Sequence, residues 1–169
     1  MASTTDINHD LLEKQVTRFL YREARLLDEH DYAAWLKLFT EDGIYELPSP
    51  GGDEDGDSAS SLFVIADNHD ALEFRVERLL STDNHSEFPP SFTTHVISNV
   101  EILETEGTTI RARCCFVTYR AKSRDRDIFF GHHNYVLKQM ANGDFQIKSK
   151  RTIVSQPDLR PQGRVAIIL

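Results

Sequence analysis

The spacing of apolar residues changes once along the chain, and this change limits the folds open to it. Up to about residue 80 apolar residues mostly recur every three or four positions, which is typical of amphipathic helices. From about residue 94 apolar and polar residues alternate, which is typical of strands with one buried face. Helices followed by a run of long strands predict an α+β fold with the helices on one face of a sheet.

Three helices are expected in the first half. The first carries one apolar stripe, and Asp10 with Glu13 could form its capping box; the stripe comprises Leu12, Val16, Phe19, Leu20, Ala24 and Leu27. The second follows Asp31 as N-cap and directs Trp35, Leu36, Leu38 and Phe39 inward. The third is capped by Asn68 or Asp70, with Leu72, Val76, Leu79 and Leu80 on one face.

The strands are predicted from alternation and from turn residues. A short strand is expected over 43–48, ending at Pro48, and four long ones over 94–104, 108–121, 127–140 and 144–156. Glu106-Gly107 and Asn142-Gly143 indicate tight turns, the second of type I′, so the sheet should be antiparallel. Such long strands must bend around the helices, which predicts a cone with a pocket at its open end.

Residues 49–61, SPGGDEDGDSASS, interrupt the pattern with Gly, Ser and Asp. They offer nothing to bury, so a solvated, flexible acidic loop is expected within a single domain spanning 1–169. A calcium-binding reading fails, because a loop starting at Asp53 would need Gly and Glu where Ser58 and Val64 stand.

Charge and cysteine content exclude several functions. The net charge of −8 and the pI of about 5.3 argue against nucleic-acid binding. No apolar run is long enough to span a membrane, and the polar N-terminus does not resemble a secretory signal, so a cytoplasmic location is expected. Cys114 and Cys115 are adjacent on a predicted strand and point to opposite faces, so no metal or iron–sulfur site is expected in this chain.

Several blocks, in order, resemble the β subunits of aromatic-ring-hydroxylating dioxygenases. They are VTRFLYREARLLDEHDYAAWLKLFTEDGIYELP, DNHDALEFRVERL, THVISNVEIL, FFGHHNYVL and KSKRTIV, which together span Val16 to Val154. YRAKSRDRDIFFG is most similar to the benzoate and anthranilate dioxygenase branch.

This resemblance implies an NTF2-like, or cystatin-like, cone and a non-catalytic role. In that family a larger α subunit holds a Rieske 2Fe–2S cluster and a mononuclear iron, supplied with electrons from NAD(P)H. The β subunit holds neither, and the chains form an α3β3 complex with a β trimer. The resemblance therefore implies a structural subunit of an enzyme acting on an aromatic acid or related compound, with no catalytic, cofactor or metal residues of its own.

Two segments are candidates for contact with other chains. The apolar C-terminal GRVAIIL is expected to dock, either within its own subunit or against a neighbour. A basic stretch could meet an acidic surface of the α subunit, or could be a solvated strand end; it comprises Arg111, Arg113, Arg120, Lys122, Arg124 and Arg126.

A stand-alone enzyme is the alternative, because the same fold houses dehydratases and isomerases resembling scytalone dehydratase and the SnoaL-type cyclases. Asp31, His95 and His132 would be its acid and base groups, and Tyr45 and Tyr32 could orient a substrate. Each has a structural interpretation too: Asp31 as a helix cap, His95 as a bonded pocket residue. His132 and His133 should point to opposite faces, so at most one enters a cavity. A small-ligand-binding module is a third hypothesis.

Overall fold

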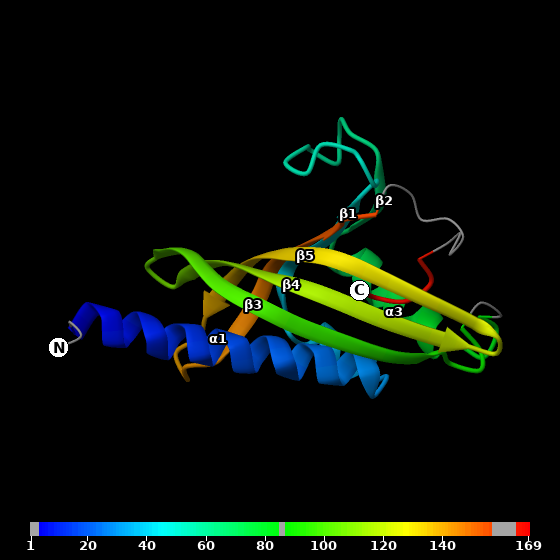
Figure 1. The fold of residues 1–169 in the computed structure, drawn as a ribbon, viewed down its shortest axis with the longest axis horizontal. Helices are drawn as coiled ribbons and strands as arrows, with labels where there is room; N and C mark the ends of the chain where they lie inside the picture. Colours follow the sequence, from blue (N-terminus) through cyan, green and yellow to red (C-terminus); the bar gives the residue numbers. More distant parts are fainter. Residues whose placement is uncertain (1–3, 85–86, 157–164) are drawn as a thin grey trace.

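The fold places three helices against one long, curved sheet, as the computed structural model shows (Figure 1). The structure describes residues 4–84, 87–156 and 165–169, with side chains described from residue 9 onward. The elements in chain order are α1 Thr4–Asp28, α2 Tyr32–Leu36, β1 Phe39–Pro48, β2 Phe63–Asp67, α3 His69–Leu80, β3 Phe92–Glu106, β4 Thr109–Lys122, β5 Asp125–Gln139 and β6 Phe145–Val154.

Helix α1 begins earlier than predicted. It starts at Thr4, so Asp10 lies inside the helix and the Asp10–Glu13 capping box is wrong. No glycine or proline interrupts residues 4–10, so nothing stops additional helical turns there. The predicted apolar stripe is confirmed: its members are buried, except for the partly buried Leu12.

The caps of α2 and α3 follow the sequence closely. Asp31 caps α2 by accepting a hydrogen bond from the backbone N–H of Ala34, at 3.0 Å. Asn68, rather than Asp70, caps α3 by accepting from Ala71 N–H. Leu72 and Val76 are buried on α3, Leu79 is partly buried, and Leu80 is exposed, contrary to expectation.

Six strands form a sheet of order β2-β1-β6-β5-β4-β3. The four predicted strands β3 to β6 are confirmed and pair as antiparallel neighbours. Strand β1 begins at Phe39, four residues before the predicted start, and lies parallel to β6. Turn residues could not reveal this pair, because all of β2 to β5 lies between the two strands in the chain. Strand β2, which pairs with β1, was not predicted.

The β5–β6 turn differs from the predicted type I′. Only Gly143 of the Asn142-Gly143 pair has positive φ, at 83°, and its N–H donates to the carbonyl of Met140. A three-residue loop ending in a left-handed glycine is the next most common hairpin connection. Gly107 supplies the positive φ of the β3–β4 turn.

Strand β3 bends along its length. Its pairing with β4 shifts register twice, between Ser98 and Glu101 and between Ile102 and Glu104, and Asn99 takes φ of 51° at the first shift. Such irregularities bend a strand and increase its twist. In Figure 1 the long strands β3, β4 and β5 sweep across α1, while the loop between β1 and β2 projects away from the sheet. No helix among the described residues is long and apolar enough to cross a membrane.

The C-terminal residues Val165–Leu169, named here the C-terminal strap, are buried within their own chain apart from the half-buried Ala166. Docking in the same subunit is therefore confirmed for these residues, although they form no strand. Gly163 and Arg164 of the predicted segment lie outside the described residues.

Gly131 on β5 is required by the close approach of β6. A Cβ at this position would collide with the backbone carbonyl oxygen of Ile153. We expect Gly131→Ala to lower the free energy of unfolding by about 2–3 kcal/mol, because the two strands must separate to admit the methyl group. Urea denaturation measures the loss. The control is Gly107→Asn, in open space at a turn where asparagine tolerates the left-handed conformation; it should cost under about 1 kcal/mol. Equal losses in the two variants would contradict the close-approach explanation.

Candidate functional site

A buried ion pair lies between the sheet and the helices. Glu23 of α1 and Lys150 of β6 are each 2% exposed, and Lys150 Nζ donates to Glu23 Oε1 at 2.8 Å. Trp35 Nε1 donates to the same oxygen at 3.1 Å, and the Tyr135 hydroxyl donates to Oε2 at 2.9 Å. The carboxylate thus accepts three hydrogen bonds, from α2, β5 and β6, which is how a buried charge is tolerated.

Two tyrosine rings flank the buried ammonium group. Lys150 Nζ lies 5.7 Å from the ring centroid of Tyr45 and 5.8 Å from that of Tyr135, within cation–π range. Burial and the negative charge of Glu23 raise the pKa of Tyr135 well above its ordinary value. The Tyr135 hydroxyl therefore keeps its proton and remains a donor to Glu23.

The C-terminal strap lies against the same interior. The N–H of Leu169 donates to the Tyr45 hydroxyl oxygen at 3.2 Å, and the carbonyl oxygen of Ile168 lies 3.0 Å from His95 Nε2. On the other side of the ring, His95 Nδ1 lies 2.6 Å from Asp28 Oδ1. Asp28 also accepts the backbone N–H of His95, so the last turn of α1 holds this histidine.

The predicted acid and base residues do not form one set. Asp31 is exposed and caps α2, and the carboxylate that contacts His95 is Asp28 instead. Tyr45 is fully buried and contacts the strap. Tyr32 is buried, and burial with the charges of Glu87 and Asp28 raises its pKa to about 12.

The two histidines of β5 lie on opposite faces, as predicted, but the interior one is His133 rather than His132. His133 stacks on Phe116 with ring centroids 4.2 Å apart, and its Nδ1 lies 2.9 Å from Thr152 Oγ1. Burial and the charge of Lys150 lower its pKa well below the ordinary value, so the ring is neutral. His132 instead lies 3.4 Å from Glu54 of the acidic loop. Phe129, Tyr135 and Leu137 are buried and alternate along β5 in step with His133. Strand alternation could therefore have identified His133 as the interior histidine from the sequence.

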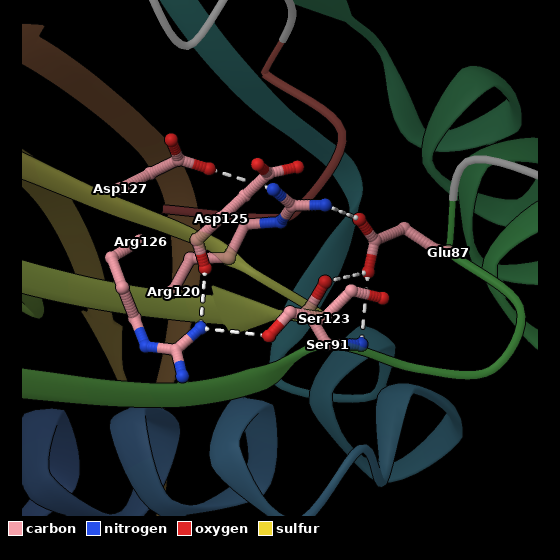
Figure 2. A network of polar contacts seen from close by, with 7 residues as sticks. All are labelled: Glu87, Ser91, Arg120, Ser123, Asp125, Arg126 and Asp127. Atoms are coloured by element: carbon pink, nitrogen blue, oxygen red, sulfur yellow. Dashed lines mark hydrogen bonds and ion pairs between the residues drawn. The ribbon is translucent and has the colours of Figure 1, made fainter.

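A second polar network joins the segment before β3 to the β4–β5 hairpin (Figure 2). Glu87 is buried, accepts from Ser91 N–H and Oγ–H, and receives Arg120 Nη2–H at 2.7 Å. Arg120 also donates to Asp127 at 2.7 Å. Burial acts to lower the pKa of Arg120, but the hydrogen bonds and charges of Glu87 and Asp127 have the larger combined effect and raise it.

The predicted basic stretch is therefore not a uniform surface. Arg120 is engaged in this network, and Arg126 donates to the carbonyls of Ser123 and Asp125 (Figure 2). Arg111 lies 3.9 Å from Glu104 of the neighbouring strand.

The residues that the structure describes do not fit the iron centres of an oxygenase. Cys114 is buried and Cys115 is exposed, on opposite faces of β4, and burial raises the pKa of the Cys114 thiol to about 12. An iron–sulfur cluster needs several thiolates or imidazoles converging on one point. Among the described residues one trio of potential metal ligands converges, His69, Asp70 and Glu73, but it contains one histidine and is largely exposed. It begins α3, where the helix dipole disfavours a cation.

Sequence reasoning missed Asp28, Glu23 and Lys150. Glu23 occupies a position inside the apolar stripe of α1, between Leu20 and Leu27, where a charge signals an interior partner. Lys150 lies within KSKRT, where neighbouring charges conceal the single buried one. Asp28 follows the stripe by one residue and carried no distinguishing pattern.

Comparison with known proteins assigns the family. The family model described as "Ring hydroxylating beta subunit" matches residues 22–160. The chain belongs to this family. The small oxygenase component of the p-cumate 2,3-dioxygenase system of Pseudomonas putida is 39% identical, covering 99% of this chain and 92% of its own. The 2-halobenzoate 1,2-dioxygenase small subunit of Burkholderia cepacia is 34% identical, covering 82% of this chain and 86% of its own.

Solved structures agree on the fold of this β subunit. A naphthalene 1,2-dioxygenase structure superposes with a TM-score of 0.80 at 20% identity, covering 99% of this chain and 95% of the matched chain. An NTF2-like protein with a cystatin-like fold from Novosphingobium aromaticivorans gives 0.60 at 16% identity, covering 99% and 96%. The predicted NTF2-like fold is confirmed, and the chain is the β subunit of an aromatic-ring-hydroxylating dioxygenase.

The buried ion pair predicts that the effects of substituting Glu23 and Lys150 on the free energy of unfolding depend on each other. Lys150→Met leaves the Glu23 charge without its partner, and we expect a loss of about 3–5 kcal/mol in unfolding free energy. Adding Glu23→Leu removes the stranded charge and should recover a large part of that loss. Urea denaturation of the single and double variants measures this coupling. A double variant as unstable as the sum of the two single variants would contradict it.

Proposed function

We propose that this β subunit supports assembly of the oxygenase and contributes no reacting group, within a complex of three α and three β chains. The observation that carries the proposal is the seating of the C-terminal strap. Its buried residues lie in the interior of the curved sheet, where a fold of this class would otherwise admit a substrate.

The groups that acid–base chemistry would require are engaged by the chain itself. Asp31 caps a helix, His95 is held between Asp28 and Ile168, and Tyr45 accepts from Leu169. His132 faces the acidic loop rather than the interior. This arrangement favours a scaffold over a stand-alone dehydratase or isomerase.

The redox centres are then held by another chain. The two relatives are named a small oxygenase component and a small subunit, which implies a larger α partner. In this family that partner binds the Rieske cluster and the mononuclear iron and receives electrons derived from NAD(P)H. Because p-cumate and 2-halobenzoate are ring-substituted benzoates, we propose an aromatic acid as substrate of the complex. We also propose that the chain acts in the cytoplasm as one domain over 1–169, with loop 49–61 mobile.

The outer face of the sheet offers a contact surface for other copies of the chain. Val96, Tyr119, Ile128 and Phe130 are each 43–49% exposed, although they are large and apolar. Strand register places Val117 between Val96 and Phe130, and Tyr119 beside Ile128, so these residues form one patch across β3, β4 and β5. Apolar patches of this kind mark protein interfaces, and we assign this one to the β trimer.

Purification of the tagged chain from its native host, grown on aromatic acids, tests the partner. We expect a brown complex with a larger chain in equal ratio and the visible absorption of a Rieske cluster. A colourless chain that remains alone under those conditions would contradict the proposal.

A negative charge placed on the apolar patch should disrupt the trimer. Phe130→Glu should convert a trimer of the isolated chain into monomers, because each interface would bury an unpaired carboxylate. Analytical ultracentrifugation measures the mass, and circular dichroism checks the fold. Leu11→Glu, an exposed position on α1, is the control and should remain trimeric. A monomeric parent chain, or a Phe130→Glu trimer, would refute the assigned surface.

A further inference from the structure

The surroundings of His95 determine how many protons its ring carries. Nδ1 lies 2.6 Å from a carboxylate oxygen of Asp28, and Nε2 lies 3.0 Å from the carbonyl oxygen of Ile168. A carbonyl oxygen only accepts hydrogen bonds, and so does an ionised carboxylate. Both ring nitrogens must then carry hydrogen, and a neutral imidazole carries only one. The geometry therefore requires an imidazolium if Asp28 is ionised.

The contacts of Asp28 keep it ionised. Burial opposes its charge, but the hydrogen bonds from the His95 ring and backbone N–H outweigh burial and lower the pKa of this carboxyl group. Both of its oxygens lie within 3.2 Å of the His95 backbone nitrogen. Asp28 and His95 thus form an ion pair, with the His95 side chain 3% exposed and that of Asp28 27% exposed.

The strap depends on this ring for one of its two side-chain anchors. The other anchor is the Tyr45 hydroxyl oxygen, which accepts a hydrogen bond from the Leu169 N–H. Ile168 and Leu169 are 2% and 0% exposed, and the two anchors hold the carbonyl oxygen and the N–H of the peptide group that joins these residues.

Other charged or titratable groups surround His95. Tyr32 of α2 interacts with Asp28, Arg25 and Glu29 of α1 line the groove that reaches His95, and Lys150 of β6 lies deeper beside Tyr45. His133 of β5 is neutral and close enough for the charge of His95 to lower its pKa, after the larger effects of burial and Lys150. Among these described groups, Asp28 is the one that hydrogen-bonds to the His95 ring.

We propose that His95, as an imidazolium paired with Asp28, is a proton-controlled latch that holds the C-terminal strap in the interior of the cone. Loss of the Nε2 proton turns this nitrogen into an acceptor that faces the Ile168 carbonyl, and the contact becomes repulsive. The strap is thus seated at lower pH and released as the pH rises. Release exposes its apolar side chains, and it uncovers Tyr45 and the Glu23–Lys150 pair beneath. This inference goes beyond the structural role proposed above.

Nuclear magnetic resonance of the full chain tests the latch directly. Nitrogen-15 shifts of the His95 ring should show both nitrogens protonated at pH 6, and the exchange protection of the Leu169 amide should be high. As the pH rises to 9, protection corrected for the intrinsic exchange rate should fall at least tenfold. A neutral His95 at pH 6 with a protected Leu169 amide would overturn the proposal.

Asp28→Asn separates a proton-controlled latch from a merely structural contact. The asparagine oxygen can still accept the His95 backbone N–H, while its amide donates to Nδ1. A neutral ring then carries its hydrogen on Nε2 and holds Ile168 at every pH. We expect this variant to keep Leu169 protected from pH 6 to 9.

Asp31→Asn is the matched control, because Asp31 is exposed and caps α2 without contacting His95. It should release the strap with rising pH as the parent chain does. The same pH dependence of Leu169 protection in the Asp28→Asn variant and the parent chain would overturn the proposal. Circular dichroism establishes that each variant is folded, and if Asp28→Asn does not fold, the parent chain's ring shifts decide the question alone.

Discussion

The ion pair of Glu23 and Lys150 is the constraint on which the interior depends. Two charges removed from water cost several kcal/mol each unless their remaining donors and acceptors are also satisfied. Here Trp35 and Tyr135 donate hydrogen bonds to the Glu23 carboxylate, and two aromatic rings flank the Lys150 ammonium group. The pair thereby fixes the relative positions of α1, α2, β5 and β6, since displacement of any one would take a hydrogen bond or the ionic partner from the buried Glu23 carboxylate.

The contacts of the C-terminal strap show that the sheet is strongly curved. It contacts His95 on β3 and Tyr45 on β1 through consecutive residues, although β4, β5 and β6 separate these strands in the sheet. In a flat sheet β1 and β3 would lie about 19 Å apart, with their side chains parallel, at a spacing of about 4.8 Å per strand. The register shifts of β3 and the close β5–β6 approach at Gly131 accompany the curvature that brings them together. A five-residue segment can then fill the space between the sheet and the helices.

Elements with a strong local signal could be predicted from the sequence. The apolar stripe of α1, the Asp31 cap and the alternation of β3 to β6 each follow from neighbours a few residues apart. The parallel β1–β6 pair could not be predicted in this way, because its partners are distant in the chain. For the same reason the sequence groups Asp31 with His95, whereas Asp28, three residues earlier, makes the contact. Asp28 ends α1 and Asp31 caps α2, and only the packing of α1 against β3 decides which of them meets His95.

The central claim is that this β subunit shapes the oxygenase without supplying a reacting group. Its most direct test is the turnover of an aromatic acid by the assembled α–β complex carrying Asp31→Asn together with His132→Ala, per mole of bound iron. We expect a rate within a few-fold of that of the parent complex, because Asp31 caps a helix and His132 faces the acidic loop. A loss of several orders of magnitude, with assembly and iron content unchanged, would contradict the account and place acid–base chemistry in this chain.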